Sequence, residues 1–223
     1  MTEASLHQYL AERADDPAVR LLAQTAAALR ADPGFIRRRD DLAAAAFLDD
    51  ETPAAMDADA LDHVLARIER QAELDRSAEA RGPERGEIAR LPSPLREAAL
   101  AALDARGWSF GGPGIRRLAL VAGRGCQAEL MRIAPGRGAA LHDHDGDEVT
   151  LVLAGGFSDE RGHYAPGDIS LARPGFRHLP VADPDVVCYV LGVTYGPPRF
   201  FGLLGFLQRA LGFPWSPVAP RAA

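Results

Sequence analysis

The chain has 223 residues, of which 47% are hydrophobic and 25% are charged, a composition typical of globular domains. No stretch approaches the roughly 18 to 20 uninterrupted apolar residues of a membrane-spanning helix. The first residues also lack the basic and apolar segments of a secretory signal. We therefore expect a cytoplasmic protein of one or two domains with no membrane partner.

The net charge of −6 is distributed unevenly along the chain. Residues 1–80 carry 17 acidic residues and 9 arginines, a net charge of −8, whereas the remainder has a net charge of +2. Direct DNA binding requires a basic surface that displaces counterions, so the acidic first third argues against it. An acidic helical surface suits a protein partner with a basic face, and it is also commonly just solvated.

The first part of the chain has the periodicity of helices. Asp16-Pro17 is a helix start signal, an N-cap followed by proline at the first helical position, and apolar residues follow at helical spacing. Asp32-Pro33 repeats the signal, and a third, amphipathic helix is expected from near Asp57. Helices of this length bury little surface alone. We predict a small helical bundle over residues 1–73 that packs against a partner, then a polar linker over residues 74–90.

From Trp108 onward, the pattern changes to short apolar strands separated by turn residues, after a short helix that ends at Gly107. The spacing of these strands is typical of a β-sandwich or jelly roll. Cys126 and Cys188 lie in apolar strands, which favours small buried side chains over a disulfide or redox pair. The predicted fold class is α+β, a helical bundle followed by an all-β domain over residues 91–223 in which short helices flank the strands.

Four residues with metal-binding side chains fall in this β region: His142, His144, Glu148 and His178. The first two are two positions apart, so on an extended strand both imidazoles project from the same face. His178 follows a Pro-Gly turn and needs a barrel to bring it to the others. Three imidazoles and one carboxylate suit zinc, iron, manganese, nickel or copper rather than calcium or magnesium. The pattern predicts one divalent metal and indicates no separate catalytic residue or organic cofactor.

This stretch resembles the cupin family. It matches the pattern Gly-x5-His-x-His-x3-Glu-x6-Gly from Gly136 to Gly155, and then Gly-x5-Pro-x-Gly-x2-His from Gly167, with Arg173 where the family usually has proline. The resemblance implies a double-stranded β-helix, or jelly-roll barrel, in which the four residues hold one metal. Zinc is the expected metal, with iron, manganese or nickel as alternatives. Pairing of two chains into a homodimer stays open.

Over residues 90–213 the sequence also resembles the ChrR-type anti-sigma factors, in the segments EVTLVLAGGFSDERGHYAPGD, RPGFRHLPVADPD and YGPPRFFGLLGFLQRALGF. These proteins join a helical anti-sigma domain to a C-terminal cupin. The resemblance implies a transcriptional regulator that binds an extracytoplasmic-function sigma factor through residues 1–73. The metal-bound cupin would sense oxidative stress or a small molecule.

The helical region departs from this family in one respect. The family's helical domain typically carries a zinc site built from an early histidine and a His-x3-Cys-x2-Cys run, whereas the corresponding stretch TAAALRADPGFIRRR has neither residue type. His7 alone does not make a structural zinc site. We therefore expect no metal in residues 1–73 and apolar packing as the source of their stability.

A metal-dependent cupin enzyme, of the dioxygenase or hydrolase type, is the alternative function. Four protein ligands leave one or two coordination positions for water, oxygen or substrate, as catalysis requires. His163 and Tyr164 are the nearest candidates for a general acid or base, and His163 is also interpreted as a surface residue. A small-molecule-binding module without a sigma partner stays open as a third function.

Overall fold

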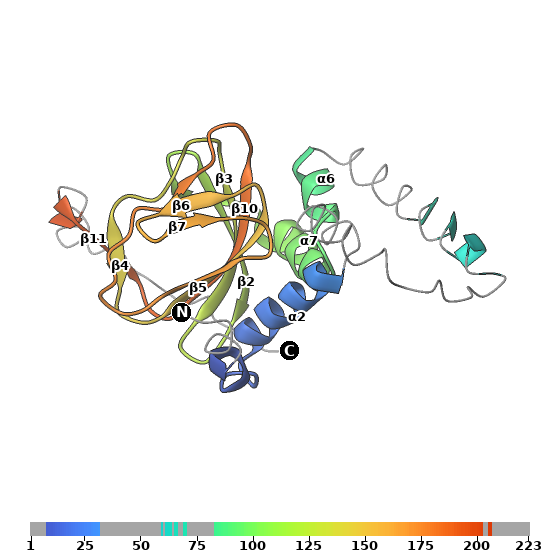
Figure 1. Cartoon of the computed structure of the whole chain (residues 1–223), viewed down its shortest axis with the longest axis horizontal. Coiled ribbons are helices and arrows are strands. Elements are labelled where there is room, and N and C mark those ends of the chain that lie inside the picture. The colour runs from blue at the N-terminus through green and yellow to red at the C-terminus, as the bar shows by residue number, and fades with distance from the viewer. Residues whose placement is uncertain are drawn as a thin grey trace, which may run out of the picture.

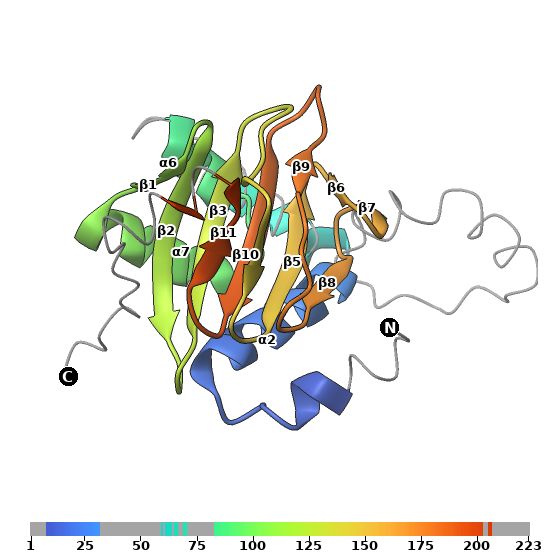
Figure 2. The same ribbon diagram turned by 90° about the vertical axis from the view of Figure 1, so that its left-hand side faces the viewer.

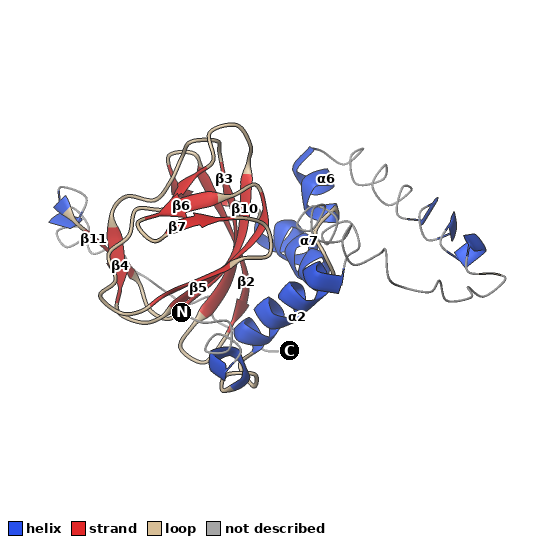
Figure 3. Ribbon diagram, viewed as in Figure 1, coloured by secondary structure: helices blue, strands red, loops and turns tan. Residues whose placement is uncertain are grey.

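The computed structural model describes residues 8–31, a few positions between 59 and 70, residues 83–202, and residues 205 and 206. Its described helices are α2 (Pro17–Ala31), α6 (Pro83–Ala89) and α7 (Leu95–Arg106). The strands follow in chain order (Figures 1 and 3): β1 (Ser109–Gly112), β2 (Ile115–Ala122), β3 (Gln127–Ile133), β4 (His142–His144), β5 (Glu148–Ala154), β6 (Phe157–Asp159), β7 (Gly162–Tyr164), β8 (Ile169–Ala172), β9 (Val181–Ala182), β10 (Cys188–Thr194) and β11 (Pro198–Phe200).

The strands form three antiparallel sheets. The largest has the order β1-β2-β3-β10-β5-β8, and two small sheets have the orders β11-β4 and β7-β6-β9. Figures 1 and 2 show the small sheets on one side of the six-stranded sheet and the helices on the other. Strands distant in sequence are neighbours, as where β10 lies between β3 and β5. The predicted α+β class with a jelly-roll barrel is confirmed.

Side chains on the six-stranded sheet alternate between its two faces, as the pleat of a strand requires. The face toward the helices is apolar and belongs to one buried core, which includes Leu118, Leu130, Leu151 and Leu191. The face toward the small sheets lines a cavity and carries Arg117, Glu129, Thr150 and Glu148. The sheet therefore separates a packed apolar layer from a polar barrel interior.

Helix α2 begins where the sequence predicts it. Oδ1 of Asp16 accepts hydrogen bonds from the backbone N–H groups of Ala18 and Val19, at 2.9 and 3.5 Å, which is the bonding of an N-cap. The buried face of the helix includes Val19, Leu22 and Leu29, and it packs on the outer face of the six-stranded sheet. This helix from the predicted bundle thus shares its core with the barrel.

The helix before the barrel is also confirmed, since α7 ends at Arg106 and Gly107 follows it with a positive φ of 69°. The segment predicted as a linker, residues 74–90, contains α6, whose Ile88 is fully buried. Ile88 and the small Ala89 are the only buried apolar side chains among those described in α6, and two adjacent positions give no amphipathic stripe, so the periodicity did not reveal this helix. The domain boundaries at residues 73 and 90 stay predictions.

Several predicted helices lie wholly or mainly outside the described residues. The second helix, from Asp32, is not described, and of the third only residues 61–63, 65–66 and 69–70 are described as helical, with Leu61 and Leu65 exposed. Of the expected C-terminal helix, residues 202, 205 and 206 are helical. Within the described parts of the chain, no helix is long and apolar enough to cross a membrane.

Candidate metal centre

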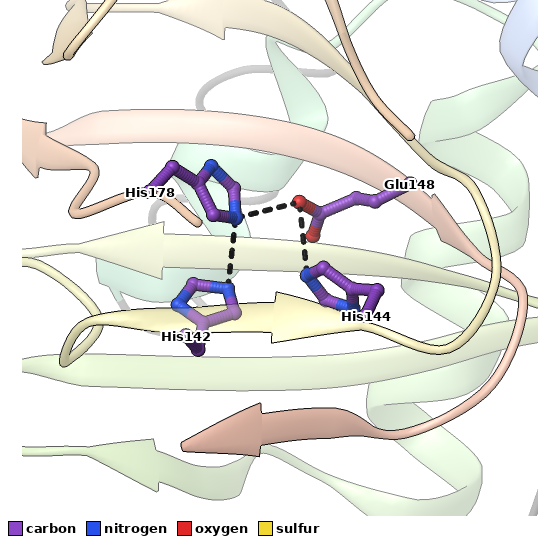
Figure 4. A group of neighbouring side chains, drawn as sticks. All are labelled: His142, His144, Glu148 and His178. Carbon is purple, nitrogen blue, oxygen red and sulfur yellow. Dashed lines mark hydrogen bonds and ion pairs between the residues drawn. The ribbon is translucent and has the colours of Figure 1, made fainter. Parts of the chain in front are cut away.

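The structure brings together the four residues singled out by the sequence pattern. One potential ligand atom from each of His142, His144, Glu148 and His178 lies within 4.8 Å of those of the other three. The Nε2 atoms of His142 and His178 are 3.0 Å apart, and Oε2 of Glu148 lies 3.3 Å from Nε2 of His144 and 3.5 Å from Nε2 of His178. Figure 4 shows the four side chains converging from separate segments.

Backbone pairing brings these residues into register. His142 and His178 form a β-bridge in which each backbone N–H donates to the other's carbonyl oxygen, at 3.1 and 2.9 Å. The two histidines of β4 flank Asp143, so both rings project to the barrel interior. Glu148 begins β5, directly after the turn that follows β4. The barrel thereby closes the 30-residue gap in sequence that separates Glu148 from His178.

Burial and mutual proximity determine the charges of this cluster. The three histidines are only 3 to 5% exposed. Burial lowers the pKa of His142 to about 4 and lowers that of His178, because a charged imidazolium loses its hydration there. Burial opposes the ionisation of Glu148, but the surrounding histidines outweigh it and lower its pKa to about 2. At neutral pH the site therefore offers His142 and His178 as neutral imidazoles and Glu148 as a carboxylate, the forms in which these side chains bind metals.

A second ring of contacts orients the imidazoles. Nδ1 of His142 lies 2.7 Å from the carbonyl oxygen of Ala140, to which it can donate, and this leaves Nε2 with a free lone pair toward the cluster. Nδ1 of His178 faces the carboxylate of Asp159 at 3.9 Å. Asp159 is in turn paired with Arg161 at 2.9 Å. Such partners fix the orientation of a ligating ring.

Arg199 on β11 connects the loop after β4 to the neighbouring strand. It donates two hydrogen bonds to Asp143, at 2.8 and 3.0 Å, and pairs with Asp145 at 2.8 Å. These hydrogen bonds hold the pKa of Asp143 below its usual value. Through Arg199, both aspartates help to join β4 to β11.

The donor set fits a transition metal. Zinc bonds of about 2.0 to 2.2 Å around a tetrahedral ion place neighbouring ligand atoms about 3.4 Å apart. Three separations in the cluster, of 3.0, 3.3 and 3.5 Å, are close to this value, and all four ligand atoms lie within 4.8 Å of one another. Nδ1 of His144 is buried without a hydrogen-bond partner among the described residues, so no hydrogen bond at this atom holds the ring away from a metal. A cluster of this kind can bind one metal ion.

The two residues considered as acid or base candidates lie away from the cluster. His163 pairs with Asp183 on the surface, at 3.1 Å, and Tyr164 stacks on Phe157 with ring centroids 4.8 Å apart. Neither is among the residues that line the cavity beside the metal cluster. The described cavity lining therefore lacks the general acid or base that the enzyme hypothesis had considered.

Sequence reasoning missed the polar groups that surround the cluster, above all Asp159, Arg161 and Arg199. Each is an ordinary charged residue in a strand or turn, and no fixed spacing ties it to the ligand pattern. Arg161 also donates to Ser170 and to the carbonyl oxygen of Leu171, both at 2.7 Å. The alternation of β6 was the one available signal, because it places Asp159 on the same face as Phe157, which lines the cavity.

The N-terminal segment lies against the loops next to the four candidate ligands, through Tyr9. Tyr9 is 3% exposed, and burial, with the neighbouring carboxylate of Asp147, raises the pKa of its phenol. The guanidinium of Arg173 lies 5.6 Å from the Tyr9 ring centroid. Asp147 directly precedes Glu148, and Arg173 occupies the position at which cupins usually have proline.

A second contact joins the start of α2 to the β2–β3 hairpin. Oδ2 of Asp16 accepts a hydrogen bond from the backbone N–H of Arg124 at 2.6 Å, and Oδ1 accepts one from the thiol of Cys126 at 3.3 Å. Burial, followed by the charge of Asp16, raises the pKa of this thiol to about 12, so it remains a donor. Cys126 and Cys188 are both buried and free, as expected.

A family model, a related sequence and a solved structure all relate this chain to the same family. A family described as the ChrR cupin-like domain matches residues 96–196. The anti-sigma-E factor ChrR of Cereibacter sphaeroides is 33% identical over 164 residues, 74% of this chain and 74% of that protein. The crystal structure of Rhodobacter sphaeroides SigE in complex with the anti-sigma ChrR matches with a TM-score of 0.52 and 27% identity, over 87% of this chain and 97% of the other. The resemblance found in the sequence is confirmed, and the chain belongs to the family of ChrR-type anti-sigma factors.

Proposed function

We propose that this chain is an anti-sigma factor whose helical region, residues 1–73, binds an extracytoplasmic-function sigma factor. The relatives support this proposal, since one is an anti-sigma-E factor and the other is an anti-sigma protein in complex with SigE. Sequestration would keep the sigma factor from core polymerase in the cytoplasm. The domain division into residues 1–73, 74–90 and 91–223 is part of this proposal.

The cupin would be the sensing half of the protein. His142, His144, Glu148 and His178 would hold one divalent metal, with zinc as the first candidate. No metal is assigned to residues 1–73, where the stretch from 25 to 39 has no cysteine or histidine. A bound metal would supply Lewis acidity and one or two coordination positions open to the cavity, which is where oxidative stress or a small molecule would be detected.

One observation carries the connection between the two halves: α2, a helix of the proposed sigma-binding region, is packed on the barrel. Its apolar face shares a core with the six-stranded sheet, and Asp16 bonds to the β2–β3 hairpin. Tyr9 lies beside Asp147, the residue next to the proposed ligand Glu148. A change at the metal can therefore reach the N-terminal segment through the short path from Glu148 and Asp147 to Tyr9. It controls sigma binding only if it shifts the equilibrium between two conformations of the helical region.

The experiment is a binding measurement with full-length protein and purified SigE of Rhodobacter sphaeroides, alongside a pull-down from the native cells with identification by mass spectrometry. We expect an extracytoplasmic-function sigma factor to be recovered and to be bound at 1:1. Metal-loaded and metal-free protein are then compared for hydrogen exchange in residues 8–31. Failure to bind or recover any sigma factor would refute the partner, and identical exchange in both forms would refute control through the metal.

The enzyme alternative retains one favourable observation, a cavity of about 140 Å³ that adjoins the cluster. Its lining offers no unpaired acid or base besides the proposed ligands, since Glu129 is paired with Arg117. Oxygen uptake by iron-loaded protein with small diketones or thiols would favour a dioxygenase. Absence of turnover with every metal of the expected set would refute the enzyme alternative.

A further inference from the structure

The cavity beside the metal cluster has a polar end and an apolar end. It measures about 140 Å³ and lies inside the barrel, between the six-stranded sheet and the small sheets. The strand register places Gln127, Thr194 and Glu148 at one end of the lining, and toward the other end the lining includes apolar side chains: Ile115, Met131, Ile133, Phe157 and Val190. An engineered apolar cavity of about 150 Å³ binds benzene, so this space holds a molecule of about six to eight heavy atoms.

Gln127 is the unusual residue in this lining. Its side chain is 3% exposed, and its Oε1 atom has no hydrogen-bond partner among the described residues. A buried acceptor that lacks a donor costs about 1 to 3 kcal/mol. Because Gln127 lines the cavity and no described residue donates to Oε1, a donor for this acceptor must come from the contents of the cavity, either water or a bound molecule.

The strand register places this acceptor in the same row as the proposed metal ligand. Thr194 on β10 pairs with Gln127 on one side and with Glu148 on the other. With strands about 4.8 Å apart, the backbones of Gln127 and Glu148 are about 10 Å apart, and both side chains point into the cavity. A small molecule bound to the metal at one atom can therefore reach Oε1 of Gln127 with another.

The charged residues nearby do not compete for such a molecule. Arg117 donates to Glu129 at 3.0 Å, and the two side chains form an ion pair at the cavity wall. Because Arg117 and Glu129 neutralise each other, neither is expected to bind an ionic group of the ligand. The remaining lining favours an aliphatic or aromatic body.

We propose that the cavity is a binding site for a small molecule with three features. It carries an oxygen or nitrogen atom that binds the metal, an N–H or O–H group that donates to Oε1 of Gln127, and a short apolar end toward Ile115 and Ile133. Gln127 is the residue that selects for the donor. The proposal deepens the sensing half of the proposed function and rests on the metal site of that function.

The test uses full-length protein loaded with cobalt(II), whose visible absorption reports ligand binding at the metal. Two probes of nearly equal chelating chemistry are titrated: acetohydroxamate, which has an N–H donor, and N-methylacetohydroxamate, which lacks it. One hydrogen bond is worth about 0.5 to 1.5 kcal/mol, so we expect Gln127→Met to lower the ratio of the two affinities about threefold to tenfold. The control Gln24→Met makes the same change at an exposed position of α2 and leaves the ratio unchanged.

The unliganded variant provides a second, independent measurement. Methionine matches glutamine in volume and removes the unsatisfied acceptor, so Gln127→Met should be at least as stable as the native chain in thermal unfolding. A variant that is destabilised or fails to fold would show that Gln127 has a structural partner, and this would overturn the proposal. An unchanged probe ratio in a folded, cobalt-loaded variant would overturn it as well.

The sigma-binding measurement separates this inference from the function on which it rests. If the chain binds the sigma factor but Gln127→Met leaves the probe ratio unchanged, the selecting role of Gln127 is wrong and the anti-sigma function stands. If the ratio changes as expected but no sigma factor is bound, the ligand site stands and the proposed partner is wrong.

Discussion

Replacement of Asp16 by alanine tests whether α2 is held on the barrel by a single buried carboxylate. The side chain caps α2, which is worth about 1 kcal/mol, and it accepts a hydrogen bond from the backbone of Arg124, which is worth about 2 kcal/mol because the acceptor is charged. We expect Asp16→Ala to lower the free energy of unfolding by about 3 kcal/mol. For a chain of this length, that is a fall in Tm of about 6 to 12 °C.

Urea unfolding followed by circular dichroism measures this change, and hydrogen exchange of residues 8–31 shows whether it is centred on α2. The matched control is Asp15→Ala, because Asp15 is the exposed neighbour of Asp16. Equal urea midpoints for the two variants would refute the reasoning. Loss of protection throughout the barrel with none in α2 would refute it too, since the contact would then serve the hairpin alone.

The same carboxylate predicts a pH dependence. Burial opposes its ionisation, but hydrogen bonds from Arg124, Ala18, Cys126 and Val19 outweigh burial and lower its pKa. Since the folded-state pKa lies below the unfolded-state value, the stabilisation is present above about pH 4 and is lost as the pH falls through the folded-state pKa. The difference between native protein and Asp16→Ala should therefore shrink below about pH 4, and a constant difference would contradict the assignment.

Three further predictions concern the barrel. The double variant His142→Ala/His144→Ala should lose the one metal ion per chain that mass spectrometry is expected to find in the native protein, and metal retained by the variant would refute the ligand set. Because the folded-state pKa of His142 is about 4 and its usual value 6.5, metal-free protein should lose stability as the pH falls from about 6.5 to about 4, by up to about 3 kcal/mol. A flat stability profile over this window in urea unfolding would contradict the neutral state of the buried imidazole. Gly138→Ala should destabilise the chain by about 1 to 3 kcal/mol, since a Cβ atom would overlap the carbonyl oxygen of Pro180, and an unchanged Tm would show that the backbone there can move.

The sequence was most informative where local rules act alone. The start of α2 at Asp16-Pro17, the end of α7 at Gly107 and the strands of the six-stranded sheet follow from capping, glycine and alternation, each of which operates within a few residues. The four residues of the metal cluster were picked out by spacing on one strand and by the cupin pattern. Their convergence within 4.8 Å depends on barrel closure, which no local rule contains.

Other features could not be read from the sequence because they join distant positions. The local sequence predicts Asp16 as a helix cap. It does not reveal that Asp16 also accepts a hydrogen bond from the backbone of Arg124, 108 residues later. Gln127 reads as a polar residue in a strand, and only the cavity reveals that its acceptor lacks a donor. Helix α6 went unnoticed because Ile88 is buried by α7 and not by a stripe of its own.

The packing of both α2 and α7 on the outer face of the six-stranded sheet has a consequence for the chain between them. Helix α2 ends at Ala31 on this face, and α6 begins at Pro83 beside α7, so both ends of the intervening stretch are anchored to one body. A sigma factor bound by the chain between these two helices would therefore be joined to the barrel through both α2 and α6, so its release and any rearrangement of the helices on the sheet would be mechanically linked.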